Sequence, residues 1–196
     1  MARNTDFMSI IHQMAPAPKD EESKDQQADA YAEALFLRAF TAYENDLEKL
    51  FLHYVTGGGS LKGVVAKTYF REIDETLARK ITRAGYKFLS WAKPQEIRKT
   101  AENYIENGWP ISEVMNSKSK DLADCEKIRN RIAHKSIESI NSFNEVQRNL
   151  LNTERLFEIT PGQLLRIRNG RSKELNISLY IGVMSDTLEA ILDPPP

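Results

Sequence analysis

The chain has 196 residues, of which 41% are hydrophobic and 28% are charged, and its formal net charge is -1 at pH 7. This balance is typical of one folded domain, and it excludes both a disordered chain and a strongly basic protein that coats nucleic acid through its overall charge. No apolar run approaches the roughly 18 residues that a transmembrane helix needs, so we expect no membrane span.

The first 27 residues are predicted to form a flexible tail. Residues 15–27 (APAPKDEESKDQQ) consist of proline, charged and amide side chains with almost no group that can pack in a core. A short apolar strip at Phe7, Ile10 and Ile11 leaves a partner-binding arm as an alternative to a disordered leader. Residues 28–196 are expected to form the folded domain.

A long amphipathic helix is predicted from Ala28 to the glycines at 57–59, because apolar residues recur every three or four positions. The run GGGSLKG that follows resembles a phosphate-binding loop only loosely, since Lys62 precedes the last glycine. We interpret it as a helix stop and turn.

Two more helices are predicted over 61–82 and 95–106, the second starting after Pro94 and closing at Asn107 and Gly108.

The C-terminal half is also predicted to be helical. Four residues at helical spacing mark a buried face: Leu122, Cys125, Ile128 and Ile132. Capping boxes predict helix starts at Ser142 and at Thr160, the second helix ending at Asn169-Gly170, and a last helix is predicted over 175–192. With no alternating strand pattern, and with short polar turns between helices, the sequence predicts an all-α antiparallel bundle.

The most informative residues are Arg129, Asn130 and His134, which follow the buried face around Ile128. On a straight helix, Asn130 and His134 share one flank, whereas Arg129 points about 140° away from His134. Either the helix ends near Ala133, or a second copy of the same surface completes the site.

This set of residues suits cleavage of a phosphodiester without a metal. An imidazole exchanges protons near neutral pH, a guanidinium stabilises a phosphate whose charge grows, and an amide orients either group. RNA supplies its own nucleophile, the 2′-hydroxyl, so the site would act on RNA and not on DNA. The alternative is a solvated helix face with an ordinary surface histidine.

No metal-binding pattern includes the one cysteine, Cys125, or the scattered histidines, so we expect no metal or other cofactor. A single cysteine is also typical of a protein in a reducing, cytoplasmic location.

The run KIRNRIAHKS at residues 127–136 resembles the signature of the HEPN superfamily, in which a histidine follows an arginine and a polar residue after about four to six positions. It is most similar to prokaryotic, RiboL-PSP-type HEPN ribonuclease domains, and the resemblance extends over residues 28–192 in the order of the helices. It implies a helical bundle that forms a homodimer in which two motifs face one another across a cleft. It also implies a metal-independent endoribonuclease of toxin–antitoxin, phage-defence or CRISPR systems, whose products carry 2′,3′-cyclic phosphates.

The resemblance also assigns roles to individual residues. It makes His134 the general acid or base, Arg129 the group that stabilises the scissile phosphate and Asn130 the group that positions it. The neighbouring cations are predicted to contact RNA: Lys127, Arg131 and Lys135. Residues 138–173 are longer than a minimal four-helix domain needs, so we interpret them as an insertion that covers the cleft or binds a partner such as an antitoxin or a defence-system protein. A similar start at Arg168 and Asn169 lacks the histidine and receives no role.

Other functions remain open at this stage. The main alternative is a catalytically silent HEPN-like module that binds nucleotide, RNA or a protein partner, and a weaker one is a helical scaffold.

The segment 79–99 is rich in basic residues interleaved with Tyr86, Phe88 and Trp91. This pattern is typical either of a face that binds single-stranded RNA or of core aromatics beside solvated charges. His53 is expected at the C-terminal end of the first long helix, where the dipole favours a cation. A carboxylate of that helix could pair with Arg129, the candidates being Glu44, Asp46 and Glu48.

Overall fold

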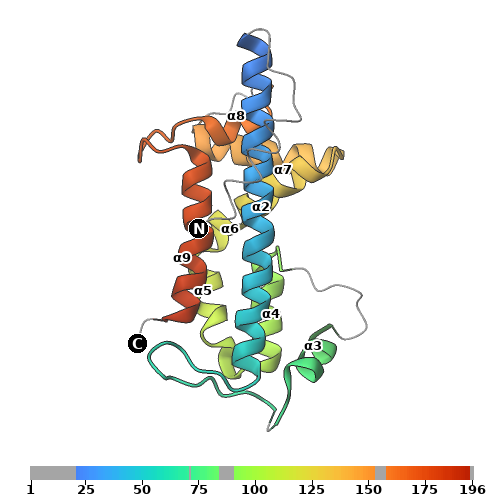
Figure 1. Cartoon of the computed structure of the whole chain (residues 1–196), viewed down its shortest axis with the longest axis vertical. Coiled ribbons are helices and arrows are strands. Elements are labelled where there is room, and N and C mark those ends of the chain that lie inside the picture. Colours follow the sequence, from blue (N-terminus) through green and yellow to red (C-terminus); the bar gives the residue numbers. More distant parts are fainter. Residues whose placement is uncertain (1–20, 71, 84–90, 153–157, 195–196) are drawn as a thin grey trace.

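The computed structural model describes residues 21–70, 72–83, 91–152 and 158–194 (Figure 1). Throughout these residues the regular structure is helical, with only isolated β-bridges besides, so the predicted all-α class is confirmed. None of the helices in these ranges combines the length and apolar composition needed to cross a membrane. The helices are α2 (Glu21–Val55), α3 (Glu75–Arg83), α4 (Pro94–Tyr104), α5 (Ile111–Ser117), α6 (Ser119–Ala133), α7 (Ile137–Leu151), α8 (Pro161–Arg166) and α9 (Asn176–Leu192), with a 3-10 turn η1 (Glu106–Gly108) after α4.

Helix α2 is the long axis of the molecule (Figure 1), and α3, α6, α8 and α9 pack directly against it, while α7 packs on α6 and α5 packs on α4. It contributes a row of fully buried apolar side chains at helical spacing, among them Phe36, Phe40, Leu47 and Phe51. Consecutive rings touch along this row, since the ring centroids of Phe36 and Phe40 lie 6.2 Å apart. The burial of these rings accounts for the helix through tertiary packing rather than through intrinsic propensity.

The predicted tail is wrong for residues 21–27, which form the first turns of α2. Arg166 of α8 donates to the carboxylates of Asp29 at 2.6 Å and Asp25 at 3.0 Å. These contacts hold the charged start of α2 against α8, which composition alone did not indicate. The remaining tail, residues 1–20 with the apolar strip, lies outside the described residues.

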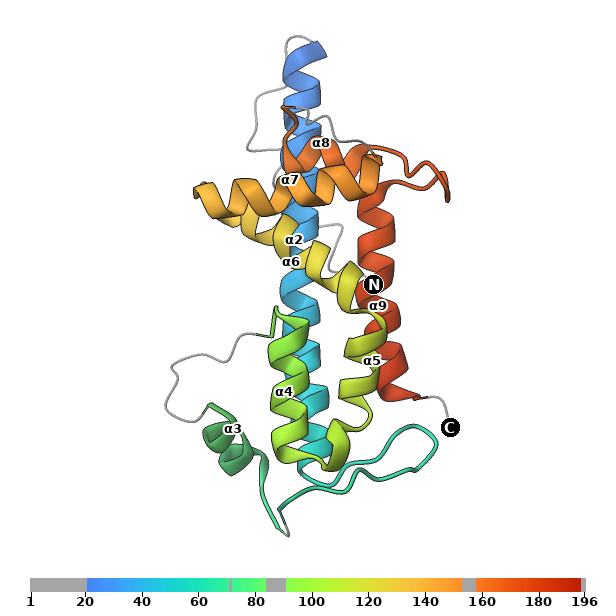
Figure 2. The same ribbon diagram turned by 180° about the vertical axis from the view of Figure 1, so that it is seen from behind.

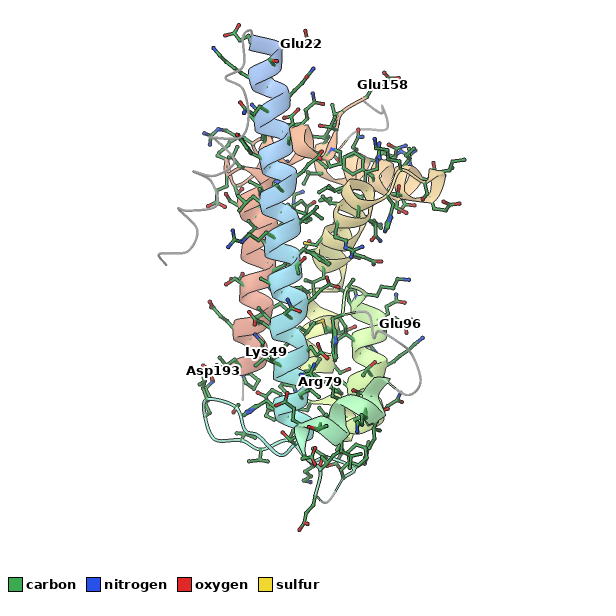
Figure 3. The ribbon with its side chains drawn as sticks, turned by 45° about the vertical axis from the view of Figure 1, so that its right-hand side comes forward. Glu22, Lys49, Arg79, Glu96, Glu158 and Asp193 are labelled. Atoms are coloured by element: carbon green, nitrogen blue, oxygen red, sulfur yellow. The ribbon has the colours of Figure 1, made fainter. Side chains whose placement is uncertain are left out.

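The helix predicted over 61–82 is also wrong, because only Glu75–Arg83 is helical within the described part of that range. Gly57 and Gly63 adopt positive φ, and the backbone pairs Gly59 with Val65, so the glycine run ends α2 as predicted and then forms a turned loop. Most of the apolar residues that suggested a helix are exposed, with Val65 at 56%, Tyr69 at 63% and Leu77 at 46%, although Ile73 packs against the core. Lys62 lies 3.1 Å from Asp193 at the end of α9, so its charge fastens this loop to the C-terminal end of the chain (Figure 3).

The short connection between α4 and α5 makes these two neighbouring helices antiparallel. Ser112 donates to Glu102 at 2.6 Å and Arg98 donates to Asn116 at 3.1 Å, so α4 and α5 run in opposite directions. Helices α2 and α9 instead run parallel (Figures 1 and 2). Phe36 meets Tyr180 near the start of both helices, and the Tyr54 hydroxyl donates to the Ile191 carbonyl near both ends, at 2.7 Å. The prediction of a wholly antiparallel bundle is therefore wrong, because most of the chain separates α2 from α9 and no short turn sets their direction.

Residues 138–173, predicted to be an insertion, contain most of α7 and all of α8, which lie across the N-terminal half of α2 (Figure 2). The capping box at Thr160 is confirmed, although α8 ends at Arg166 and not at Asn169-Gly170. The box predicted at Ser142 is wrong, since Ser142 lies inside α7. The side chain of Ser136 caps that helix and accepts a hydrogen bond from the Ser139 amide.

Gly162 allows α8 to approach α2 closely, and this contact predicts a stability effect. A Cβ atom at this position would overlap the backbone of Asp29. We expect Gly162→Ala to lower the free energy of unfolding by about 1–3 kcal/mol in urea titrations. The matched control is Gly170→Ala, whose added Cβ meets no atom within 4 Å and should change stability by less than about 0.5 kcal/mol. Equal losses in the two variants would contradict this close packing.

Candidate functional site at the end of helix α6

Helix α6 buries most of the apolar face predicted for it, and it ends immediately before His134. Leu122, Cys125 and Ile128 are buried, and the helix stops at Ala133. His134 is the C-cap residue with extended backbone angles (φ -133°, ψ 141°), although its amide still donates to the Asn130 carbonyl at 2.8 Å. The first of the two geometric alternatives, a helix that ends near Ala133, is confirmed.

Two of the three motif residues form a hydrogen-bonded chain with a carboxylate. A guanidinium nitrogen of Arg129 donates to Oδ1 of Asn130 at 3.2 Å, and Nδ2 of Asn130 donates to Oε1 of Glu126 at 3.2 Å. The amide is thereby held with its oxygen toward Arg129. Sequence analysis missed Glu126, although its position four residues before Asn130 is the spacing at which helical side chains meet.

Arg129 also faces α2, the helix on which a carboxylate partner was considered. Burial raises the pKa of the Glu44 carboxyl, and the positive charge of Arg129 acts in the opposite direction. The other two candidates are engaged elsewhere, since Asp46 pairs with Lys49 at 2.7 Å and Glu48 pairs with Arg79 at 2.7 Å. Glu44 is therefore the α2 carboxylate whose charge Arg129 influences.

The His134 side chain is exposed and does not join this chain of hydrogen bonds. Its carbonyl accepts from the Ser139 hydroxyl at 2.9 Å, which fixes the backbone of the corner between α6 and α7. The ring itself has no hydrogen-bond partner among the described residues. This corner projects sideways from the axis of α2 (Figures 1 and 2). Within one chain, the described contacts thus bring Arg129 and Asn130 together but not His134.

The three cations predicted to contact RNA differ in how much of their charge is available. Lys127 lies 2.9 Å from Glu145 and 3.9 Å from Asp124, so it links α6 to α7. Lys135 is exposed beside His134, and Arg131 is partly exposed. Neither of these two makes an ion pair with a described carboxylate.

Within the basic and aromatic segment 79–99, the structure describes residues 79–83 and 91–99, and there it shows a core aromatic and a paired cation. Trp91 is buried against Phe51 with ring centroids 5.1 Å apart, and Arg79 is paired with carboxylates of α2 and α3 (Figure 3). Of the two alternatives left open for this segment, the core aromatic is confirmed for Trp91. Tyr86 and Phe88 lie outside the described residues.

His53 is at the end of α2 as predicted, and it serves the glycine turn. Its ring shares a hydrogen bond of 3.0 Å with the Gly59 carbonyl, and a Cβ atom on Gly58 would overlap it. These contacts give His53 a structural role at the C-terminal end of α2, beyond the position of Glu44.

A pocket of about 500 Å³ begins at Glu126 and continues between the N-terminal ends of α4 and α6. Lys93 and Lys120 line it together with Glu96 and Glu126, so its charges balance and it has no evident preference for an anion. In the described part of the chain, no group of three or more His, Cys, Asp or Glu residues is arranged to hold a metal ion.

No family model, curated protein or solved structure matches the chain.

Proposed function

We propose that the protein is a metal-independent endoribonuclease of the HEPN type, which acts in the cytoplasm as a toxin or phage-defence effector with an antitoxin or defence-system partner. One observation carries the proposal: a guanidinium oriented by an amide lies five residues before an exposed imidazole, at the end of a helix that projects from the fold. These are the groups that transfer of an RNA phosphate to its own 2′-hydroxyl requires when no metal takes part.

In this mechanism each group has a defined task. A base takes the proton from the 2′-hydroxyl, the 2′-oxygen bonds to phosphorus, and the bond to the 5′-oxygen breaks as that oxygen receives a proton. His134 is suited to one of the two proton transfers because its ring is exposed to substrate. Arg129 stabilises the extra charge on the phosphate, and Asn130 orients Arg129 through the 3.2 Å hydrogen bond.

A homodimer with a composite site would bring the separated groups together. Close to His134 in the sequence lie two exposed apolar residues, Ile137 at 73% and Ile140 at 38%. Such residues gain about 25 cal/mol per Å² when they are removed from water. A second copy packed on this corner would cover them and place its own Arg129 near His134, in a two-fold contact.

The cations around the motif predict a contrast in RNA binding. Lys135→Ala should weaken RNA binding and reduce the slope of log affinity against log salt concentration by about 0.7, the loss expected for one phosphate contact with a single strand. Lys127→Ala should leave that slope unchanged, because Glu145 and Asp124 already neutralise its charge. Salt titrations of binding, measured by fluorescence anisotropy in a His134→Ala background, check the contrast. Equal effects of the two variants would contradict the assignment.

The function itself is tested by incubating the purified protein in EDTA with single-stranded RNA, structured RNA and the corresponding DNA. We expect cleavage of RNA alone, products with 2′,3′-cyclic phosphate ends, and loss of cleavage in Arg129→Ala and His134→Ala. Equal cleavage by all three proteins would identify a contaminating nuclease. RNA binding without cleavage, together with no toxicity in cells, would favour the alternative of a silent binding module.

A further inference from the structure

Glu126 belongs to the hydrogen-bonded chain near the end of α6, but the mechanism proposed above gives it no task. Its Oε1 accepts from Nδ2 of Asn130 at 3.2 Å, and Oδ1 of Asn130 accepts from Arg129 at 3.2 Å. All three residues are partly exposed, so they lie where a substrate can reach them. The chain therefore begins at a carboxylate and ends at the group proposed to stabilise the scissile phosphate.

The donors and acceptors along this chain fix the orientation of the central amide. A guanidinium can only donate hydrogen bonds and an ionised carboxylate can only accept them, whereas an amide has a donor end and an acceptor end. Asn130 lies between the two, so both contacts form only when its oxygen faces Arg129 and its nitrogen faces Glu126. An amide turned by 180° would lose both hydrogen bonds, because donor would then face donor and acceptor would face acceptor.

Glu126 contacts Arg129 through the amide and does not neutralise it. In the described part of the chain, no carboxylate makes an ion pair with Arg129. The charge of the guanidinium therefore remains for a phosphate, as the stabilisation of developing charge requires. The neighbouring Lys127 differs in this respect, since its charge is paired with Glu145 at 2.9 Å.

We propose that Glu126 is a positioning residue of the ribonuclease site, which fixes the amide of Asn130 and through it the guanidinium of Arg129. This role rests on the proposed function, because it assigns Glu126 to the same reaction. A carboxylate can also act as a general base, which would be a different role. The contacts favour positioning, since Oε1 of Glu126 is already engaged by Asn130.

Two substitutions of Glu126 separate positioning from proton transfer. Glu126→Ala removes the acceptor, and we expect kcat and kcat/KM for RNA cleavage to fall together by about 10- to 100-fold, the cost of a misplaced catalytic group. Glu126→Gln keeps an oxygen that can accept from Asn130 but cannot act as a base, and it should stay within about threefold of the wild type. Both variants should fold, because Glu126 is partly exposed and borders the pocket of about 500 Å³.

A double-mutant cycle with Asn130→Ala tests whether Glu126 acts through this amide. Once the amide is absent, Glu126→Ala should reduce cleavage by less than about twofold further, whereas independent effects would multiply. A second measurement does not depend on activity: the side-chain amide resonances of Asn130, identified by their absence in Asn130→Ala, should shift in Glu126→Ala. The matched control is Asp121→Ala, which removes an exposed carboxylate from the first turn of α6 and should cleave RNA as the wild type does.

The proposal is overturned if Glu126→Ala cleaves like the wild type, if the two substitutions multiply in the cycle, or if the Asn130 resonances do not shift. It is also overturned if Glu126→Gln is as inactive as Glu126→Ala, a result that would assign proton transfer to Glu126. A wild type that cleaves no RNA in EDTA is a separate outcome. It would overturn the proposed function, and with it this role in catalysis, even if the Asn130 resonances shift.

Discussion

His134→Ala should reduce RNA cleavage by about 10²- to 10⁴-fold, the range that one general acid or base contributes. The variant should remain folded, because the ring is exposed and makes no hydrogen bond to the described residues. Single-turnover cleavage in EDTA measures the effect on the chemical step. RNA affinity should change little, since the loss is of proton transfer and not of phosphate binding.

The matched control for this experiment is His53→Ala, which removes the exposed imidazole at the glycine turn. We expect wild-type cleavage from it, apart from a small loss of stability. Comparable losses of activity in the two histidine variants would contradict the assignment of His134, and so would full activity of His134→Ala.

Arg129→Ala should reduce cleavage by about 10²- to 10³-fold, because a fixed donor that stabilises developing charge contributes about that much. It should also release Asn130 Oδ1, which now accepts from the guanidinium at 3.2 Å. Arg129→Lys should restore only part of the activity, since an ammonium cannot make two parallel bonds to a phosphate.

Mixing the two inactive variants tests the composite site. If Arg129 of one chain serves His134 of the other, each heterodimer of Arg129→Ala with His134→Ala contains one intact site and one doubly defective site. Random reassortment of subunits should then recover about a quarter of the wild-type activity. Each protein alone, and the mixture before subunits exchange, serves as the control. A mixture that stays inactive although heterodimers are present would show that both groups act from the same chain.

The sequence predicted those elements that are determined by local signals. The stripe of α6, the capping box at Thr160 and the extent of α9 depend on residues within one or two turns of each other. The elements that could not be predicted from the sequence depend on contacts between residues far apart in the chain. The charged residues 21–27 are helical because Arg166 binds Asp25 and Asp29.

In the segment 61–82, a local pattern predicted a helix that distant contacts replace with a loop over much of its length. Apolar residues recur there at helical spacing, yet Gly63 takes a positive φ and the chain folds back to pair Gly59 with Val65. A hydrogen bond of 2.9 Å from the Leu61 amide to the Leu192 carbonyl then fixes the loop against the end of α9. The spacing of apolar residues could not predict this loop, because the end of α9 that binds it is more than 100 residues away in the sequence.

At the candidate site, residue types were predictable and partners were not. The spacing of Arg129, Asn130 and His134 is visible in the sequence, and the end of the helix near Ala133 was one of two alternatives. The packing of α6 on α2 determines which carboxylate of α2 has its pKa lowered by the charge of Arg129. That carboxylate is Glu44, one of the three candidates. The ion pair of Lys127 could not be predicted for the same reason, since its partner Glu145 belongs to the next helix.

The most direct test of the account uses an RNA whose cleaved linkage has first been mapped, with a single 2′-deoxy substitution on the nucleotide that precedes it. In EDTA, the account predicts that cleavage at this linkage disappears while cleavage at other linkages is unchanged, because the removed hydroxyl is the nucleophile. Continued cleavage at the substituted linkage would contradict the account, and so would cleavage that appears only when a divalent metal is added.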